Sequence, residues 1–183
     1  MIHDVSRIDR LITDYSQMLK DELAISSEQM EDVDLKPIIE SVVDDFNNIY
    51  IEKKNLNIKL NTSSSKKFLI KGISNRLEQI IANLLDNAVS FSKNGSSVLV
   101  ELSKDETNIS LKVIDQGDGF RETDIKKVFD RFYSNRPENF GEHSGLGLNI
   151  VKNLVDIHKG KIFASNNPQG GAMVEIKFPK NYN

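Results

Sequence analysis

Apolar residues recur along the chain with two spacings, one typical of helices and one typical of strands. They return every three or four positions over residues 37–53, 73–90 and 145–158, which predicts three helices with one apolar face each. Alternation of apolar and polar residues predicts a short strand around Val33 and Leu35. It predicts further strands in LNIKL, FLIK, SVLVELSK, NISLKVID, GKIFAS and AMVEIKF.

A helix with a single apolar side must bury that side against another element, and a sheet can provide the surface. The turn-forming stretches DETN and NNPQGG each join two of the predicted strands into a pair. We therefore expect an α/β (α+β) fold, a two-layer α/β sandwich in which a mixed, largely antiparallel sheet carries helices on one face.

The first 30 residues have a different pattern. Val5, Ile8, Ile12, Tyr15 and Leu19 are spaced alternately by three and four, which predicts an N-terminal helix with a heptad seam. A seam this short needs a partner helix to be stable. The polar stretch AISSEQMED then reads as a linker, so we expect residues 1–30 and 31–183 to form separate units.

Charge and composition narrow the function classes. The 183 residues carry a formal net charge of −3, which gives no broad attraction to nucleic acid or anionic lipid. The chain has no cysteine, and we find no apolar run long enough to span a bilayer and no signal peptide. These features predict a cytoplasmic chain that contacts neither nucleic acid nor membrane.

Four motifs stand between or within these elements. NLLDNA places Asn83 and Asn87 one turn apart on the helix over 73–90, and DQGDGF follows a strand. FDRFY lies in a long polar connection, and HSGLGL opens the last helix. Glycines at a helix start suit an anion, because they allow a ligand to approach unpaired backbone N–H groups; an ordinary tight loop would also explain them.

The order of these motifs resembles that of the ATP-binding domain of two-component sensor histidine kinases. That domain belongs to a superfamily with gyrase-type ATPases, heat-shock-90 chaperones and mismatch-repair ATPases. NLLDNA is similar to its N box, DQGDGF to its G1 box, FDRFY to its F box and HSGLGL to its G2 box, over roughly residues 31–179. RIDRLITDYSQML is similar to the second helix of the dimerisation hairpin that precedes this domain.

The resemblance implies ATP and Mg²⁺ as ligands, with Asn87 coordinating the metal. An ionised Asp115 would accept a hydrogen bond from the exocyclic amine of adenine, although an Asp capping a turn after a strand is the alternative. Phe91 is either beside the adenine or part of the core. The full set of implied nucleotide contacts is Asn83, Asn87, Phe91, Asp115, Gly117, Gly119, Phe132, Ser144, Gly145, Leu146, Gly147 and Leu148.

Catalytic roles would fall to Asn83, Arg131 and Arg136. Hydrolytic members of the superfamily carry a water-activating Glu four residues before the magnesium-binding Asn, whereas this chain has Asn83 there. An amide cannot act as a general base, so the site favours phosphoryl transfer over hydrolysis. Either arginine could neutralise charge on the γ-phosphate.

The phosphoacceptor histidine of such a kinase is not evident in the chain. His3 is followed by Asp4 but by no proline, while His143 lies in the G2 box and His158 at the end of a helix. We therefore expect the acceptor on a hairpin outside this chain and a response regulator downstream. We also expect weak or incomplete homodimerisation, and a parent kinase anchored in the membrane by segments absent here. The alternatives are a nucleotide-regulated binding module and a self-contained ATPase.

Overall fold

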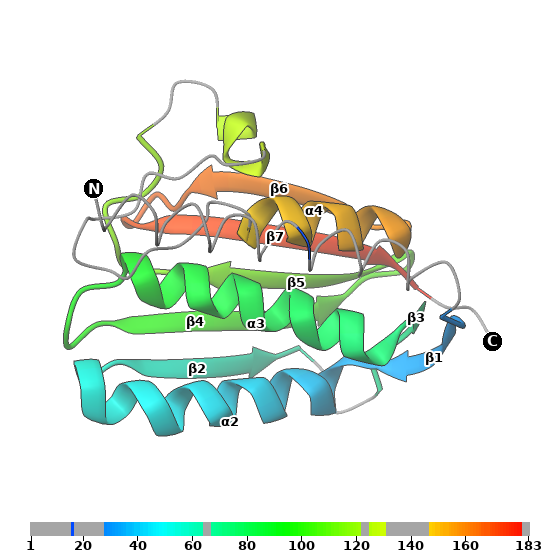
Figure 1. The fold of residues 1–183 in the computed structure, drawn as a ribbon, viewed down its shortest axis with the longest axis horizontal. Coiled ribbons are helices and arrows are strands. Elements are labelled where there is room, and N and C mark those ends of the chain that lie inside the picture. The colour runs from blue at the N-terminus through cyan, green and yellow to red at the C-terminus, as the bar shows by residue number, and fades with distance from the viewer. Residues whose placement is uncertain (1–15, 17–27, 64–66, 122–124, 131–146, 181–183) are drawn as a thin grey trace.

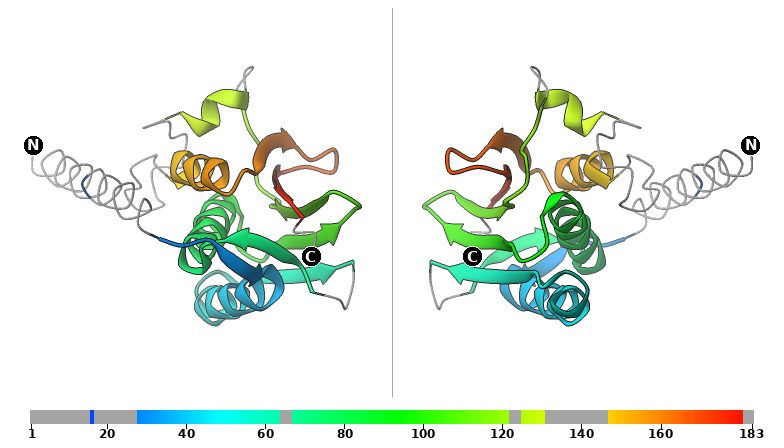
Figure 2. Two further views of the ribbon diagram at one scale, coloured as in Figure 1. Left: turned by 90° about the vertical axis from the view of Figure 1, so that its right-hand side faces the viewer. Right: turned by 90° about the vertical axis from the view of Figure 1, so that its left-hand side faces the viewer.

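A five-stranded sheet with three helices on one face forms the body of the protein. The computed structural model describes residues 16, 28–63, 67–121, 125–130 and 147–180. The sheet has the order β2-β4-β5-β7-β6, and Figures 1 and 2 show the helices lying side by side over it. Its strands are β2 (Asn57–Thr62), β4 (Ser97–Lys104), β5 (Asn108–Ile114), β6 (Lys161–Asn166) and β7 (Ala172–Pro179). The helices are α2 (Leu35–Lys54), α3 (Ser74–Phe91) and α4 (Gly147–Ile157), together with a short 3-10 helix, η1 (Ile125–Phe129).

The strand pairing confirms the predicted mixed, largely antiparallel sheet. β2 pairs with β4 in parallel, and the other three neighbouring pairs are antiparallel. The predicted FLIK strand lies outside this sheet: β3 (Leu69–Gly72) pairs with β1 (Glu31–Asp34) in a separate two-stranded sheet. Residues 28–34 are therefore joined to the rest of the domain through the pairing of β1 with β3.

The core lies between the sheet and the helices. Inward-facing residues of β4 such as Val98, Val100 and Leu102 are almost completely buried, as are Ile80 and Leu85 of α3. Each such aliphatic side chain contributes about 1.5–3 kcal/mol on burial. This packing fixes α3 against the sheet, with α2 and α4 on its two sides.

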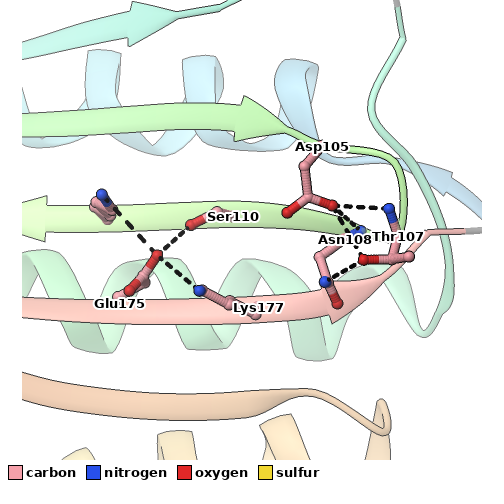
Figure 3. A network of polar contacts seen from close by, with 7 residues as sticks. Asp105, Thr107, Asn108, Ser110, Glu175 and Lys177 are labelled. Carbon is pink, nitrogen blue, oxygen red and sulfur yellow. Dashed lines mark hydrogen bonds and ion pairs between the residues drawn. The ribbon is translucent and has the colours of Figure 1, made fainter.

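The open face of the sheet is polar, as strand alternation predicts. In Figure 3, Glu175 on β7 accepts a hydrogen bond from Ser110 Oγ at 2.8 Å and forms ion pairs with Lys177 at 3.8 Å and Lys112 at 4.0 Å. The DETN turn is closed by Asp105, whose Oδ1 accepts the backbone N–H groups of residues 107 and 108, both at 2.7 Å. These hydrogen bonds lower the pKa of Asp105.

Two element boundaries differ from the sequence prediction. Leu35 begins α2 instead of continuing a strand, because the Asp34 side chain accepts the N–H of Lys36 and caps the helix. The helix expected over 145–158 is described from Gly147 to Ile157. The predicted N-terminal helix lies outside the described residues apart from Ser16, so the division at residue 30 stays a prediction.

Candidate functional site

Helix α3 carries two of the predicted site residues on one side. Leu77, Ile81 and Leu84 bury its opposite side in the core. Asn83 and Asn87 are one turn apart and half-buried, so both lie near the helix surface. The second of them stands one turn before Phe91, where the helix ends.

Asp115 follows β5 directly and is 4% exposed. Its Oδ1 accepts the backbone N–H of Gly117 at 2.8 Å and that of Ala172 at 3.0 Å. Its Oδ2 has no hydrogen-bond partner among the described residues. Burial raises the pKa of this carboxyl, and the two N–H groups oppose that rise. The carboxylate is therefore fixed through Oδ1 alone among the described contacts.

The DQGDGF segment packs against the end of α3. A Cβ added at Gly117 would lie 2.5 Å from the carbonyl oxygen of Phe91 and 3.1 Å from Oδ1 of Asp115. Only glycine allows this approach. The structure thus brings Asp115, Gly117 and Phe91 together, with Asn87 one turn back along the helix.

The next part of this segment is held by the β6–β7 hairpin. Asn166, at the end of β6, makes two hydrogen bonds to the backbone of Phe120: its Oδ1 accepts the N–H at 2.6 Å and its Nδ2 donates to the C=O at 3.0 Å. Gly119 has φ +76°, and a Cβ there would lie 2.7 Å from Asn166 Oδ1. Sequence reasoning treated NNPQGG only as a turn and missed this contact.

Helix α4 begins at the second glycine of HSGLGL. A Cβ at Gly147 would meet no atom of the described residues within 4 Å, so no protein contact among them requires a glycine. Leu148 is half-buried against the core. The following Asn149 is buried and donates from Nδ2 to the carbonyl of Phe129 at 2.9 Å, while its Oδ1 has no hydrogen-bond partner among the described residues. This amide ties α4 to η1, and sequence reasoning did not single it out.

The remaining predicted site residues cannot be placed. Arg131, Phe132, Arg136 and the stretch 144–146 lie outside the described residues. The structure therefore places only these predicted site residues: Asn83, Asn87, Phe91, Asp115, Gly117, Gly119, Gly147 and Leu148.

A lysine from α2 holds the C-terminal end of α3. Lys54 Nζ donates to the carbonyl oxygens of Val89 and Ser92, both at 2.9 Å. These carbonyls belong to the last turn and the cap of the helix, where a cation is favourable. Burial lowers the pKa of Lys54. The contact fixes the helix end against which Gly117 packs.

His158 joins the opposite end of α3 to α4. Its Nε2 accepts the backbone N–H of Ile73 at 3.0 Å, and its Nδ1 lies 2.6 Å from the carbonyl oxygen of Leu154. This geometry assigns the proton to Nδ1 of a neutral ring. The ring is 3% exposed, and burial lowers its pKa. A side chain so enclosed is structural and offers no accessible nitrogen to a phosphate.

The first turn of α3 also contacts the segment that precedes β1. Arg76 is buried and forms a two-pronged ion pair with Glu28, with Nη2 to Oε1 at 3.0 Å and Nε to Oε2 at 3.3 Å. Charge-assisted pairs of this geometry are among the stronger hydrogen bonds in proteins. The helix that carries both asparagines is thus linked to residue 28.

Neither a membrane span nor a protein-only metal cluster occurs in the described ranges. No helix there combines the length and apolar character needed to cross a bilayer. No three His, Cys, Asp or Glu side chains gather there to hold an ion.

Comparison with known proteins gives the family. A family model described as "Histidine kinase-, DNA gyrase B-, and HSP90-like ATPase" matches residues 72–182. Among curated relatives, the sensor protein ChvG of Agrobacterium fabrum is 34% identical over 173 residues, covering 91% of this chain and 29% of the relative. The signal transduction histidine-protein kinase BaeS of Escherichia coli is 28% identical over 179 residues, covering 96% of this chain and 38% of the relative. This chain therefore spans less than two fifths of either relative.

Solved structures agree. The mycobacterial sensor histidine kinase MprB is similar with a TM-score of 0.71 and 27% identity, covering 84% of this chain and 99% of that one. The catalytic domain of histidine kinase ThkA shares the fold, with a TM-score of 0.73 at 22% identity over 83% of this chain and 96% of that one. The chain belongs to the family of histidine kinase-, DNA gyrase B- and HSP90-like ATPases, as a catalytic ATP-binding domain of the sensor histidine kinase type.

Proposed function

We propose that this chain binds ATP at the site formed by α3, Asp115 and the DQGDGF segment, and transfers the γ-phosphoryl group to a histidine on a separate hairpin. The observation that carries the proposal is the Oδ2 atom of Asp115, which accepts no hydrogen bond from the described residues and lies beside the end of the helix that bears Asn87. Within the described residues Asn149 Oδ1 is the one buried polar side-chain atom without a partner, so Oδ2 of Asp115 retains access to the surface, where a bound ligand can donate to it.

Adenine is the base that suits this oxygen. Its exocyclic amine would donate to Oδ2 of Asp115, whereas the oxygen at the same position of guanine would be repelled. The two backbone N–H groups on Oδ1 favour the ionised form that this contact needs. Phe91, half-buried at the end of α3, would border the base.

The polyphosphate would extend from the base toward Asn87 and the start of α4. The neutral amide oxygen of Asn87 suits Mg²⁺, which prefers oxygen ligands and retains phosphate and water partners. That ion would neutralise charge on the transferred phosphate. The space at Gly147 and the first N–H groups of α4, which a helix start leaves without partners inside the helix, would suit the phosphate oxygens.

One feature favours transfer to a histidine over hydrolysis. Asn83 offers an amide where a general base would be needed to activate water. The γ-phosphoryl group would instead meet the lone pair of a histidine nitrogen. The new P–N bond forms as the P–O bond to the β-phosphate breaks, ADP leaves, and the other ring nitrogen releases its proton to solvent. Positioning by the site and charge neutralisation by Arg131 or Arg136 would supply most of the catalysis.

The residues outside the described ranges complete the proposed site. Phe132, Ser144, Gly145 and Leu146 would close around the nucleotide together with Leu148. We further propose that the partners are a phosphoacceptor hairpin and a response regulator, that the chain self-associates weakly, and that it works in the cytoplasm as part of a membrane-anchored kinase.

A two-part experiment tests the proposal. A fluorescent ATP analogue is titrated into wild type, Asp115→Asn and the control Asp105→Asn, which alters an exposed turn between β4 and β5. We expect Asp115→Asn to weaken binding by roughly 10- to 100-fold, because a hydrogen bond to a charged group is lost. The control should bind as wild type does.

Mixing wild type with Mg-ATP and a histidine-bearing hairpin should then give an acid-labile phosphohistidine. Bound ATP without transfer would support a nucleotide-regulated binding module. Steady phosphate release by the chain alone would support a self-contained ATPase. Either result would refute the kinase proposal.

A further inference from the structure

The β6–β7 hairpin contacts Asp115, the predicted adenine contact, although the hairpin lies outside all four motifs. Ala172, the first residue of β7, donates its N–H to Oδ1 of Asp115 at 3.0 Å and accepts the backbone N–H of Asp115 at 3.0 Å. The residue before it, Gly171, is buried with φ +88°. A Cβ at that position would overlap the carbonyl oxygen of Asp115 and lie 3.0 Å from its Oδ1. The hairpin backbone therefore lies directly against this aspartate.

The same hairpin holds the far end of the DQGDGF segment. The two hydrogen bonds from Asn166 to Phe120 resemble the pairing of one more strand residue at the edge of β6. The position of Gly119 next to this amide leaves no room for another side chain. The segment from Asp115 to Phe120 is thus fixed at both ends by one hairpin.

These contacts decide which carboxylate oxygen of Asp115 is left for a ligand. The N–H groups of Gly117 and Ala172 both hold Oδ1, so rotation of the carboxylate would break two hydrogen bonds at once. Oδ2 alone remains to accept from a ligand. A small displacement of the hairpin would remove the Ala172 bond and let the carboxylate turn.

We propose that Gly171 and Asn166 are positioning residues for base selection, which hold Asp115 and the segment after it so that Oδ2 meets the 6-amino group of a purine. This inference rests on the proposed ATP site and deepens it. Neither residue touches the nucleotide itself; each acts through Asp115 or Phe120. Base discrimination is therefore set partly by the hairpin and not by the G1 box alone.

A pair of neighbouring glycines provides the test. Gly170 has φ +97° and an added Cβ there meets nothing within 4 Å, so Gly170→Ala introduces the same kind of backbone strain without touching Asp115. Affinity for ATP and for inosine triphosphate, which has an oxygen in place of the 6-amino group, is measured by displacement of a fluorescent analogue. We expect Gly171→Ala to reduce the preference for ATP over inosine triphosphate by about tenfold or more, as loss of a charged hydrogen bond implies. Gly170→Ala should keep the preference within about twofold of wild type.

Asn166→Ala provides a second test that leaves the buried turn intact, since Asn166 is exposed. Its control is Asn167→Ala, because within the described part of the chain Asn167 forms hydrogen bonds only through its backbone. We expect Asn166→Ala to reduce the preference for ATP by about threefold or more, and its control to keep it. A purely structural role would weaken both nucleotides equally and leave their ratio unchanged.

The outcomes separate this inference from the proposed function. If wild type binds ATP and prefers it over inosine triphosphate, but neither Gly171→Ala nor Asn166→Ala changes the preference, the positioning role is refuted and the ATP site stands. If Gly171→Ala does not fold, Asn166→Ala decides alone. If wild type has no preference for ATP, the proposed base contact of Asp115 fails and the inference fails with it.

Discussion

Replacing Lys54 with methionine should loosen the end of α3. Methionine keeps most of the aliphatic stem but removes the ammonium group that donates to Val89 O and Ser92 O at 2.9 Å. No basic residue lies in the last turn of α3 itself, so this lysine from α2 is the cation at that helix end. The two carbonyls would then depend on water.

The size of the effect follows from these contacts. A hydrogen bond to a charged group contributes about 1.5–3 kcal/mol when buried, and a cation at an exposed helix C-terminus contributes about 0.3–1 kcal/mol. Lys54 is half-buried, and water can partly replace its ammonium group at the carbonyls. We therefore expect Lys54→Met to lower the free energy of unfolding by about 1–2 kcal/mol, which corresponds to a fall in Tm of roughly 2–8 °C in a chain of this size.

Urea unfolding followed by circular dichroism measures this loss, with Lys53→Met as the matched control. Lys53 is the neighbouring residue on α2 and is exposed, so its removal should change stability by less than about 0.5 kcal/mol. Equal losses in the two variants would refute the idea that Lys54 caps α3. So would a Lys54→Met protein as stable as wild type.

Three further results are expected. Because burial raises the pKa of Asp115, its carboxyl becomes protonated at a higher pH than an ordinary aspartate; ATP affinity should therefore fall on acidification, and Asp115→Asn should abolish this dependence in a fluorescence titration. The pKa of His158 is lowered on folding, so the unfolded chain binds the extra proton and stability should decline as pH falls below about 6.5; His158→Gln should reduce the slope by up to about 1.4 kcal/mol per pH unit in urea titrations. In a double-mutant cycle of Glu28→Gln and Arg76→Met, stabilities should show a coupling energy of about 1–2 kcal/mol, and additive losses would contradict a working ion pair.

Much of the fold follows from periodicity. Alternation of apolar and polar residues in SVLVELSK and NISLKVID correctly predicted β4 and β5, because each of these strands buries one face only. Periodicity could not say that FLIK leaves the main sheet, since the separate pairing of β3 with β1 depends on contacts distant in sequence. The alternation of Val33 and Leu35 predicted a strand through Leu35. The Asp34 side chain instead caps α2, so Leu35 begins the helix.

The site was predictable where function requires a particular residue type. Asn87 and Asp115 stand in recognisable motifs and lie near one helix end in the structure, although their roles remain proposals. Ala172 contacts Asp115 through backbone groups, and Gly171 lies against Asp115 because it has no side chain. Any glycine-containing turn offers such features, so the sequence gives no sign of this contact. Lys54 acts across two helices, and one sequence alone does not reveal such a contact.

The two-stranded sheet has a mechanical consequence. Force applied to the chain at residue 28 would load the four residue pairs between β1 and β3 and the ion pair to Arg76 before any strand of the larger sheet. The load would pass into the first turn of α3 through the ion pair and through β3, which precedes this helix. Tension or torque from the preceding segment would thus reach the helix that bears both asparagines by a short, stiff route.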